Sequence, residues 1–383
     1  MNNELEFAIE NDEDIHTSMV GRPHGSVAVI ANFYAGIFGG PLSQLLKCLT
    51  AVKVCAEFKK NGVAAAPVCL VRQDAPPGFS SGEIHLIDRG SKLRCLKSAG
   101  WEKGTPGTGI EGNEAERLFE EIEKIFPDCD SEVLSALKEA FSPDRNPVSA
   151  CAHWIKYLLK DFNVNIVEYD IFSADQNSGC SVLPNLTLPV TVFVADSAEI
   201  AEYGKAPPEK EGVPRPIVRP CPDVTISNAR SLKTLKRYGL DFTRLFEGKE
   251  SVMAYVRETM KSDISDRLQK LRDEVQAVFD EMEATAFAAC GERSRRIRKA
   301  RTARIIYQIE KIRRHSRDAL ANKEKAAENR IRKACDFLAP LARRQQDALG
   351  GAQIPLSFGL SGLRALFDGL DIATQNHQLI EMN

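Results

Sequence analysis

The chain has 383 residues, a formal net charge of −2 and 43% hydrophobic residues. This length predicts two or three domains, and the near-neutral charge gives no global reason to expect binding to nucleic acid or to a membrane. Ten cysteines without a Cys-x-x-Cys pair, an acidic N-terminus and the lack of a long apolar run favour a soluble, cytoplasmic protein without a zinc ribbon.

The first folded segment follows a polar tail at 1–25. An apolar run at 27–34 predicts a buried strand, Gly36 to Pro41 predict a turn, and an apolar-periodic stretch at 42–60 predicts a helix. Free N–H groups at such a junction, together with the helix dipole, favour a phosphate or a carboxylate. The alternative is a tight turn that only lets helix and strand pack closely.

The next elements continue an α/β pattern. A strand at 64–71 completes a strand-helix-strand unit, which implies a right-handed parallel crossover. Further elements are expected in chain order: a hairpin of strands 83–88 and 93–96, a loop at 100–112, helices at 113–126, 130–141 and 147–161, a strand at 164–169, an irregular segment at 170–187, a strand at 188–194, an extended element at 215–220 and a helix at 228–238.

From 249 to 349 the chain changes character. Glycine and proline nearly vanish, and apolar residues repeat at spacings of three and four, which predicts a coiled coil. Residues 249–292 contain 6 Lys/Arg and 10 Asp/Glu, which gives a net charge of −4. Residues 293–333 contain 16 Lys/Arg and 4 Asp/Glu, which gives a net charge of +12. We expect an antiparallel hairpin that turns near Cys290 and Gly291, with its second helix over roughly 293–346.

The basic segment at 293–333 has two interpretations. It fits a surface for nucleic acid or another anion on a coiled-coil scaffold. It also fits a solvated helix that pairs with the acidic segment or with a second subunit. Few aromatic residues are available there to stack on bases, which favours the second interpretation and makes nucleic acid an unexpected partner.

Polar side chains follow the predicted core strands. In an open parallel sheet, ligands bind beyond the carboxyl ends of the strands, and there the chain places Gln73, Asp74 and Asp196. Either aspartate could accept hydrogen bonds from a ribose or an amine, although Asp196 also fits a helix cap. The chain has no P-loop, no nucleophile elbow and no His-Glu-x-x-His motif, and His85 and His377 lack metal-ligand spacing, so we expect no metal.

Four stretches, in order, resemble the cysteine-adding enzymes of bacillithiol biosynthesis, the BshC family. They are Asn32–Leu42, Leu188–Ala201, the Pro-Arg strand Val213–Pro220 with Lys236–Leu240, and the long coil closed by Leu370-Asp371 and Asn376–Ile380. At the end of the second strand, 71–76 keep only Asp74 of that family's acidic and histidine-rich motif.

The resemblance implies an α/β fold and a reaction. The core is expected to be a Rossmann-like parallel sheet, akin to class I aminoacyl-tRNA synthetase domains, with a small helical insertion and a long α-helical coiled-coil arm that pairs subunits as a homodimer. We expect a tail at 1–25, a core at 26–248 with the insertion at about 100–161, an arm at 249–349, and a segment at 350–383 that returns to the core. The implied reaction is a ligation that joins cysteine to glucosaminyl malate through an amide bond.

The expected site combines residues from these stretches. Asp74 and Asp196 are the catalytic candidates, and no general base is assigned. A nucleotide, ATP or ADP, is a cofactor candidate. Substrate or nucleotide contacts are expected from Gly36, Gly39, Gly40, Pro41, Gln73, Arg219 and His377.

A non-catalytic relative that keeps the fold, the ligand pocket and the dimer is the alternative function. The altered motif at 71–76 favours it. The enzymatic interpretation depends on the amides after the first strand converging on a pocket for negative charge. It fails if the protein's own atoms already occupy those N–H groups.

Overall fold

The structure is a computed structural model. It describes residues 27–75, 79–102, 110, 112–169, 190–203, 217–260, 264–285, 292–374 and 377–382. The expected tail at 1–25 and the expected irregular segment at 170–187 lie outside these residues. The chain forms two compact units: Met1–Lys233 together with Asp336–Asn383, and Thr234–Cys335. The domain boundaries expected from the sequence stay a prediction.

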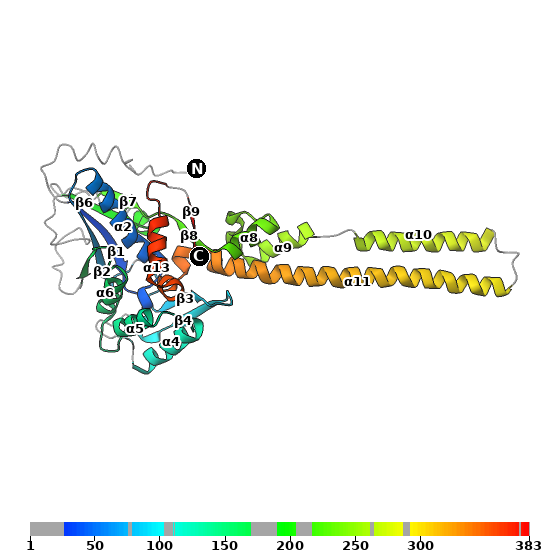
Figure 1. Cartoon of the computed structure of the whole chain (residues 1–383), viewed down its shortest axis with the longest axis horizontal. Helices are drawn as coiled ribbons and strands as arrows, with labels where there is room; N and C mark the ends of the chain where they lie inside the picture. The colour runs from blue at the N-terminus through cyan, green and yellow to red at the C-terminus, as the bar shows by residue number, and fades with distance from the viewer. Residues whose placement is uncertain are drawn as a thin grey trace. The chain divides into compact units, whose positions relative to one another are not determined.

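The first unit is built on a five-stranded parallel sheet with the strand order β5-β2-β1-β6-β7 (Figure 1). The expected parallel α/β, Rossmann-like core is therefore confirmed. Its strands are β1 (Val27–Tyr34), β2 (Ala65–Arg72), β5 (Asn165–Tyr169), β6 (Val190–Ala195) and β7 (Ile217–Pro220).

Helices cover both faces of this sheet. Helix α2 (Leu42–Lys60) and helix α6 (Pro147–Leu158) share one face, where the Cys48 thiol of α2 lies 3.3 Å from the Cys69 thiol of β2. Helix α7 (Ser197–Tyr203) lies on the other face, because its Ile200 packs on side chains of β1, β2 and β6 that alternate with Cys69 and its neighbours.

The strand order reverses between β1 and β6. From β1 the chain moves outward through β2 to β5, and it then returns to the other side of β1 to form β6 and β7. Crossover loops therefore leave β1 and β6 in opposite directions at their carboxyl ends. Such a switch point opens a crevice in doubly wound sheets, and the sequence alone did not locate it because it depends on the strand order.

The hairpin and the helical insertion follow β2. The hairpin consists of β3 (Glu83–Ile87) and β4 (Leu93–Lys97), as expected. The insertion contains α4 (Gly112–Ile125) and α5 (Ser131–Ala140), also as expected. The prediction of a loop throughout 100–112 was wrong, because helix α3 (Ala99–Glu102) forms at its start.

A serine and a glutamate stabilise the start of α3. The Ser98 hydroxyl oxygen accepts a hydrogen bond from the Trp101 amide at 3.3 Å, and Glu114 of α4 accepts one from the Ala99 amide at 3.0 Å. The glycine-rich sequence hid this turn because one of the two acceptors comes from a different helix.

The last part of the chain belongs to the first unit. It contains η4 (Pro340–Ala342), α12 (Gln345–Ala348), α13 (Gln353–Gly369) and β9 (Gln378–Glu381), and β9 pairs in parallel with β8 (Val224–Ser227).

Three buried glutamines hold this C-terminal part in place. Gln345 accepts a hydrogen bond from the Ile226 amide at 2.6 Å, and Gln346 accepts one from the Val224 amide at 2.8 Å. Gln353 accepts one from the Ile87 amide at 2.7 Å. The glutamines thus supply partners for backbone groups of β8 and of the hairpin, which fixes the segment between them against the core.

The second unit is helical and contains the arm. It comprises the end of α8 (Ala229–Tyr238), η3 (Phe242–Glu247), α9 (Lys249–Met260), α10 (Ile264–Thr285) and most of α11 (Glu292–Leu338). The expected end of the second long helix near 346 was wrong, because α11 ends at Leu338. None of the described helices is long and apolar enough to cross a membrane.

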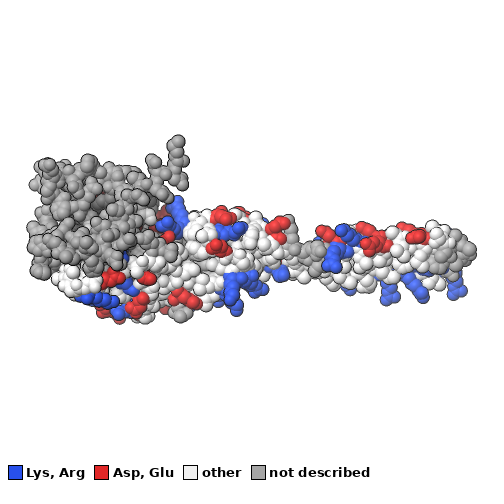
Figure 2. Space-filling view, turned by 90° about the horizontal axis from the view of Figure 1, so that it is seen from above, with Lys and Arg blue, Asp and Glu red and all other residues white. Residues whose placement is uncertain are grey.

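Helices α10 and α11 form an antiparallel hairpin held by ion pairs. Glu283 lies 2.6 Å from Arg295, and Arg272 lies 3.2 Å from Glu310. Acidic side chains gather along one edge of this hairpin and basic side chains project from the opposite edge (Figure 2). The two helices thus keep the opposite net charges of their sequences.

Candidate functional site

A cavity of about 530 Å³ opens beside the carboxyl ends of β1 and β6. We call it the switch-point cavity. Its polar lining comes from β1, the start of α2, the hairpin, the start of α7 and the C-terminal part of the chain. These residues are Tyr34, Ser43, Gln44, Ser80, Glu83, His85, Asp196, Ser197, Arg343, Arg344, Gln346 and Asp347.

One wall is formed by the end of β1 and the start of α2. Gln44 accepts a hydrogen bond from the Tyr34 amide at 3.0 Å, which ties the helix to the strand. Because Ser43 and Gln44 lie in the first turn of a 19-residue helix, the positive end of its dipole faces the cavity.

A buried lysine lies behind this wall. The Lys47 ammonium is fully buried and lies 3.0 Å from Glu199 and 3.4 Å from Asp196. It also lies 4.9 Å from the centre of the Tyr34 ring. Burial alone lowers the pKa of Lys47, but the two carboxylates outweigh burial and raise this pKa above its ordinary value. The ammonium therefore stays charged at neutral pH.

Burial also raises the pKa of the Tyr34 phenol well above its ordinary value, and the Glu199 carboxylate adds to the rise. The Tyr34 phenol therefore stays neutral at neutral pH.

The opposite wall carries two arginines. Arg344 lies 3.4 Å from Asp223, which precedes β8, and 3.3 Å from the Ser197 hydroxyl at the start of α7, so it links these two segments. Arg343, the preceding residue, also lines the cavity. Planar guanidinium groups bind carboxylates and phosphates through paired hydrogen bonds, which makes this wall a site for an anion.

Asp347 lies on the same wall. Although the residue as a whole is exposed, burial of its carboxyl group raises its pKa to about 6. Arg344 and Arg343 lower this pKa, whereas Asp196 and Asp223 raise it further. A carboxylate with such a pKa can accept a proton from a bound ligand near neutral pH.

The turn after β1 is not an anion cradle. The Ile37 amide donates to Ser81 at 2.7 Å, the Gly39 amide to Gly36 at 3.0 Å, and the Gly40 amide to Ile37 at 3.0 Å. At the helix start, the Leu42 amide donates to the Leu349 carbonyl at 2.7 Å. The protein's own carbonyl groups therefore occupy these four N–H groups. The expected anion contact through these four N–H groups is therefore not available, and the nucleotide stays a prediction.

The glycines of this turn serve close packing instead. A Cβ atom on Gly36 would lie 2.8 Å from the Cα atom of Gly40, and Gly39 has a φ of +91° with Trp154 at 3.0 Å from its Cβ position. Pro41 forms an isolated bridge with Gly350. The alternative interpretation, a tight junction between strand and helix, is the one that the geometry supports.

Two other expected residues lie outside the cavity lining. Asp74 pairs with the guanidinium of Arg72, which in turn lies over the ring of Tyr169. Gln73 accepts a hydrogen bond from the Ala75 amide at 2.8 Å through its carbonyl oxygen. Both follow β2, one strand away from the switch point, so the structure does not bring them to the cavity.

Arg219 and His377 contact the C-terminal part of the chain. Arg219 donates to the Ile372 carbonyl at 3.0 Å, and His377 lies 3.4 Å from Asp223. Burial raises the pKa of Asp223, but His377 and Arg344 outweigh burial and hold this pKa below its ordinary value. His377 is thus linked through Asp223 to the arginine wall, whereas Arg219 is not part of the cavity.

Asp196 lies at the cavity and also caps a helix. One of its oxygens accepts hydrogen bonds from the amides of Ala198 and Glu199, both at 3.0 Å, and the other faces Lys47. Glu199 accepts a hydrogen bond from the Asp196 amide in return, which completes a capping box. Because both carboxylate oxygens are engaged, Asp196 is better placed to position Lys47 than to bind an amine.

The comparison with protein families finds a match in the C-terminal part of the chain. Residues 224–382 match the family model for the C-terminal coiled-coil domain of the bacillithiol biosynthesis protein BshC. Over these residues the chain is similar to the coiled-coil domain of the BshC family. A comparison with curated proteins finds no match.

The BshC match reaches beyond the coiled coil into the cavity. It includes Arg343, Arg344 and Asp347, which form the wall opposite α2. We did not expect these residues from the sequence. Their position follows from Gln345, Gln346 and Gln353, and glutamines in an apolar stretch are the only local sign that this segment is buried and paired.

Proposed function

We propose that the chain is a ligase of bacillithiol biosynthesis, which joins the carboxyl group of L-cysteine to the amine of glucosaminyl malate in the switch-point cavity. The BshC match over 224–382 supports a role in this pathway. The observation that carries the proposal is that matched residues, the arginine wall and Asp347, meet the core sheet at its switch point.

The charges of the cavity suit such substrates. Glucosaminyl malate carries carboxylates and an amine. Arg343 and Arg344 would hold the carboxylates, with the positive end of α2 facing the same space. Asp347, which is not tied into a helix cap, would receive the amine in place of the two aspartates that we expected from the sequence.

Amide formation requires a neutral amine and an activated carboxyl group. The ammonium must lose a proton before its nitrogen can attack the carbonyl carbon, and we propose that Asp347 accepts this proton. The carboxyl group of L-cysteine would be activated at the expense of ATP, and its activating group, phosphate or AMP, would leave as the amide C–N bond forms.

The direct test is product formation. Purified protein is incubated with L-cysteine, glucosaminyl malate and ATP, and the amide product is measured by mass spectrometry. We expect the wild-type chain to form it and Arg343→Gln to raise the KM for glucosaminyl malate. Asp368→Asn, at an exposed carboxylate on α13, serves as the control and should leave KM unchanged. The absence of product from the wild-type chain would refute the proposal.

Binding without turnover is the second candidate function. The occupied amides after β1 and the pairing of Asp74 with Arg72 favour it, since both remove groups that we expected to act on substrate. Isothermal titration with glucosaminyl malate distinguishes the two functions. Binding that requires Arg343, with no product in the assay above, would identify a ligand-binding relative.

We further propose that two copies of the chain pair through the arm. The predicted apolar seam of α10 is only partly covered by α11, because Leu271, Val278 and Met282 are 45%, 54% and 38% exposed. On α11, Ile305 and Ile312 are 43% and 53% exposed. The opposite net charges of α10 and α11 allow each helix to face the other helix of a second copy.

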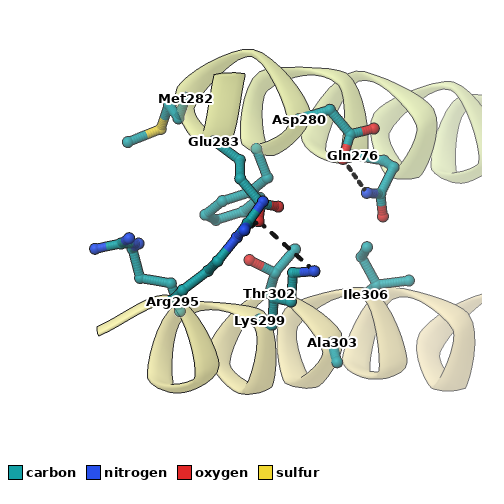
Figure 3. A pocket seen from close by; sticks show the side chains of 11 residues that line it. Gln276, Asp280, Met282, Glu283, Arg295, Lys299, Thr302, Ala303 and Ile306 are labelled. Atoms are coloured by element: carbon teal, nitrogen blue, oxygen red, sulfur yellow. Dashed lines mark hydrogen bonds and ion pairs between the residues drawn. The ribbon is translucent and has the colours of Figure 1, made fainter. Parts of the chain in front are cut away.

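An open groove near the tip of the hairpin is consistent with this pairing. It has a volume of about 370 Å³ and lies between Gln276 to Glu283 on α10 and Arg295 to Ile306 on α11 (Figure 3). Figure 3 shows the Glu283 carboxylate turned toward Arg295 and Lys299 across the groove. A helix of the second copy would cover the outward-facing apolar side chains.

Charged substitutions on the seam should separate the dimer. We expect the double variant Leu271→Glu, Val278→Glu to weaken self-association by at least about tenfold. Two apolar side chains of the proposed interface are replaced by carboxylates, which would be buried there without a counter-charge. Sedimentation equilibrium measures the change. Ala277→Glu adds a charge on the exposed side of the same helix and should leave the dimer intact. A wild-type chain that sediments as a monomer would contradict the proposal.

A further inference from the structure

The hairpin beside the cavity has one apolar face and one polar face. Ile84, Leu86 and Leu96 point into the core and are almost fully buried. The alternate positions of β3 carry Glu83 and His85, which line the switch-point cavity. In the register of the hairpin, Cys95 lies directly opposite His85, and Lys97 lies directly opposite Glu83. Strand pairing thus gathers a carboxylate, an imidazole and a thiol on one face.

These three groups are close enough to share one metal ion. The ligand atoms of Glu83, His85 and Cys95 all lie within 4.8 Å of one another, and no ion is present. His85 Nε2 and Glu83 Oε1 are 3.3 Å apart. Two ligands at about 2.0 Å from a tetrahedral zinc ion are separated by roughly 3.3 Å, so this pair already has the spacing of a zinc site.

The surroundings hold the three groups in place. The other oxygen of Glu83 lies 2.5 Å from the Lys97 ammonium, so this contact can persist while Oε1 binds a metal. The carbonyl of His85 accepts a hydrogen bond from the Gly350 amide at 2.8 Å, which fixes β3 against the C-terminal segment. Outer contacts of this kind orient metal ligands and raise the affinity of a site.

We propose that Glu83, His85 and Cys95 form a site for a zinc-type divalent metal at the edge of the switch-point cavity. Three protein ligands leave a fourth position, and since Glu83 and His85 line the cavity, that position faces the substrates. Soft thiolates are preferred ligands of such a metal. The thiol of the substrate cysteine would lose its proton to solvent and displace the metal-bound water.

This role for the metal deepens the proposed function and rests on it. Coordination through sulfur would anchor the substrate cysteine at the edge of the cavity, and it would exclude serine, which lacks a soft ligand. The spacing in the sequence did not predict the site, because Cys95 joins His85 through strand pairing and not through a short motif.

Metal binding can be tested without turnover. Untagged full-length chain is titrated with zinc under reducing conditions, and the titration is repeated with Co²⁺, whose absorption reports thiolate ligands. We expect one metal per chain with a thiolate-to-cobalt band. His85→Gln and Cys95→Ser should each weaken zinc binding by at least about tenfold. Adding L-cysteine to the cobalt form should strengthen the band, and adding L-serine should not.

Matched controls separate the site from unspecific binding. His153 pairs with Glu139 at 3.2 Å, and Cys129 is partly exposed, but neither belongs to the three-residue cluster. We expect His153→Gln and Cys129→Ser to bind zinc as the wild type does. Equal zinc binding by wild type, His85→Gln and Cys95→Ser, or none by the wild type, would overturn the site. A chain that binds metal but forms no amide refutes only the proposed function.

Discussion

Lys47→Met is expected to lower the free energy of unfolding by about 3–5 kcal/mol. The substitution removes the only cation that contacts Glu199 among the described residues, and it leaves a carboxylate that is 2% exposed without a counter-charge. Asp196 loses the same partner. Urea unfolding followed by circular dichroism measures the change.

A second variant separates the ion pair from packing. Lys47→Met combined with Glu199→Gln should recover part of the loss, because the uncompensated buried charge is then removed as well. Lys60→Met, at an exposed position at the end of the same helix, should change stability by less than about 0.5 kcal/mol. A loss below about 1 kcal/mol for Lys47→Met would show that water or another group stabilises these carboxylates.

Asp347→Asn is expected to lower kcat for amide formation by about 10²- to 10⁴-fold, the range that a positioned general base contributes. The asparagine fills the same space but cannot accept a proton. Unfolding midpoints should stay close to those of the wild type, because the residue as a whole is exposed. The product assay measures kcat, and Asp368→Asn again serves as the control.

The pH dependence of the rate of amide formation tests the role of Asp347 more directly. Because the pKa of Asp347 is raised to about 6, the active carboxylate is lost as the pH falls through 6, so the rate should fall on the acid side. Asp347→Asn should abolish this limb. The charged groups around Asp347 are Arg343, Arg344, Asp196, Asp223, Glu83 and His85.

Two outcomes would contradict the role of Asp347. An acid limb that persists in Asp347→Asn would assign it to another group of the cavity. A variant that raises KM for glucosaminyl malate while kcat stays unchanged would make Asp347 a binding residue and not a base.

Much of the fold could be predicted from local signals. The apolar run at 27–34 and the periodic segment at 42–60 gave β1 and α2 with the expected bounds, because each combines a clear period with glycine and proline at its ends. The hairpin around Gly90 and the two long helices of the arm were predicted on the same grounds.

Elements that depend on distant partners were missed. Strands β8 and β9 have four residues each and about 150 residues between them, so neither shows a pattern until it pairs with the other. The turn at 99–102 forms because Glu114 accepts the Ala99 amide. No local propensity contains this information.

The candidate site was the least predictable part. The glycine turn after β1 has the composition of an anion loop, but its Ile37 and Leu42 amides are occupied by the carbonyl groups of Ser81 and Leu349. The local sequence gives no sign of these two distant partners. Asp196 was correctly placed at the end of β6, beside the cavity. The arginines and Asp347 were missed because they follow the arm, far along the chain from the sheet.

The amino-acid sequence by itself determined the periodic elements, the opposite charges of α10 and α11, and the resemblance to the BshC family, since these depend on neighbours within a few turns of the chain. Only the tertiary structure decided which amides are occupied, where the strand order reverses, and which charged side chains share the cavity. The physical reason is that a hydrogen-bond donor or a charge acts according to what lies within a few ångströms of it. The partners of the Leu42 amide and of the Arg344 side chain, for example, come from segments more than a hundred residues away.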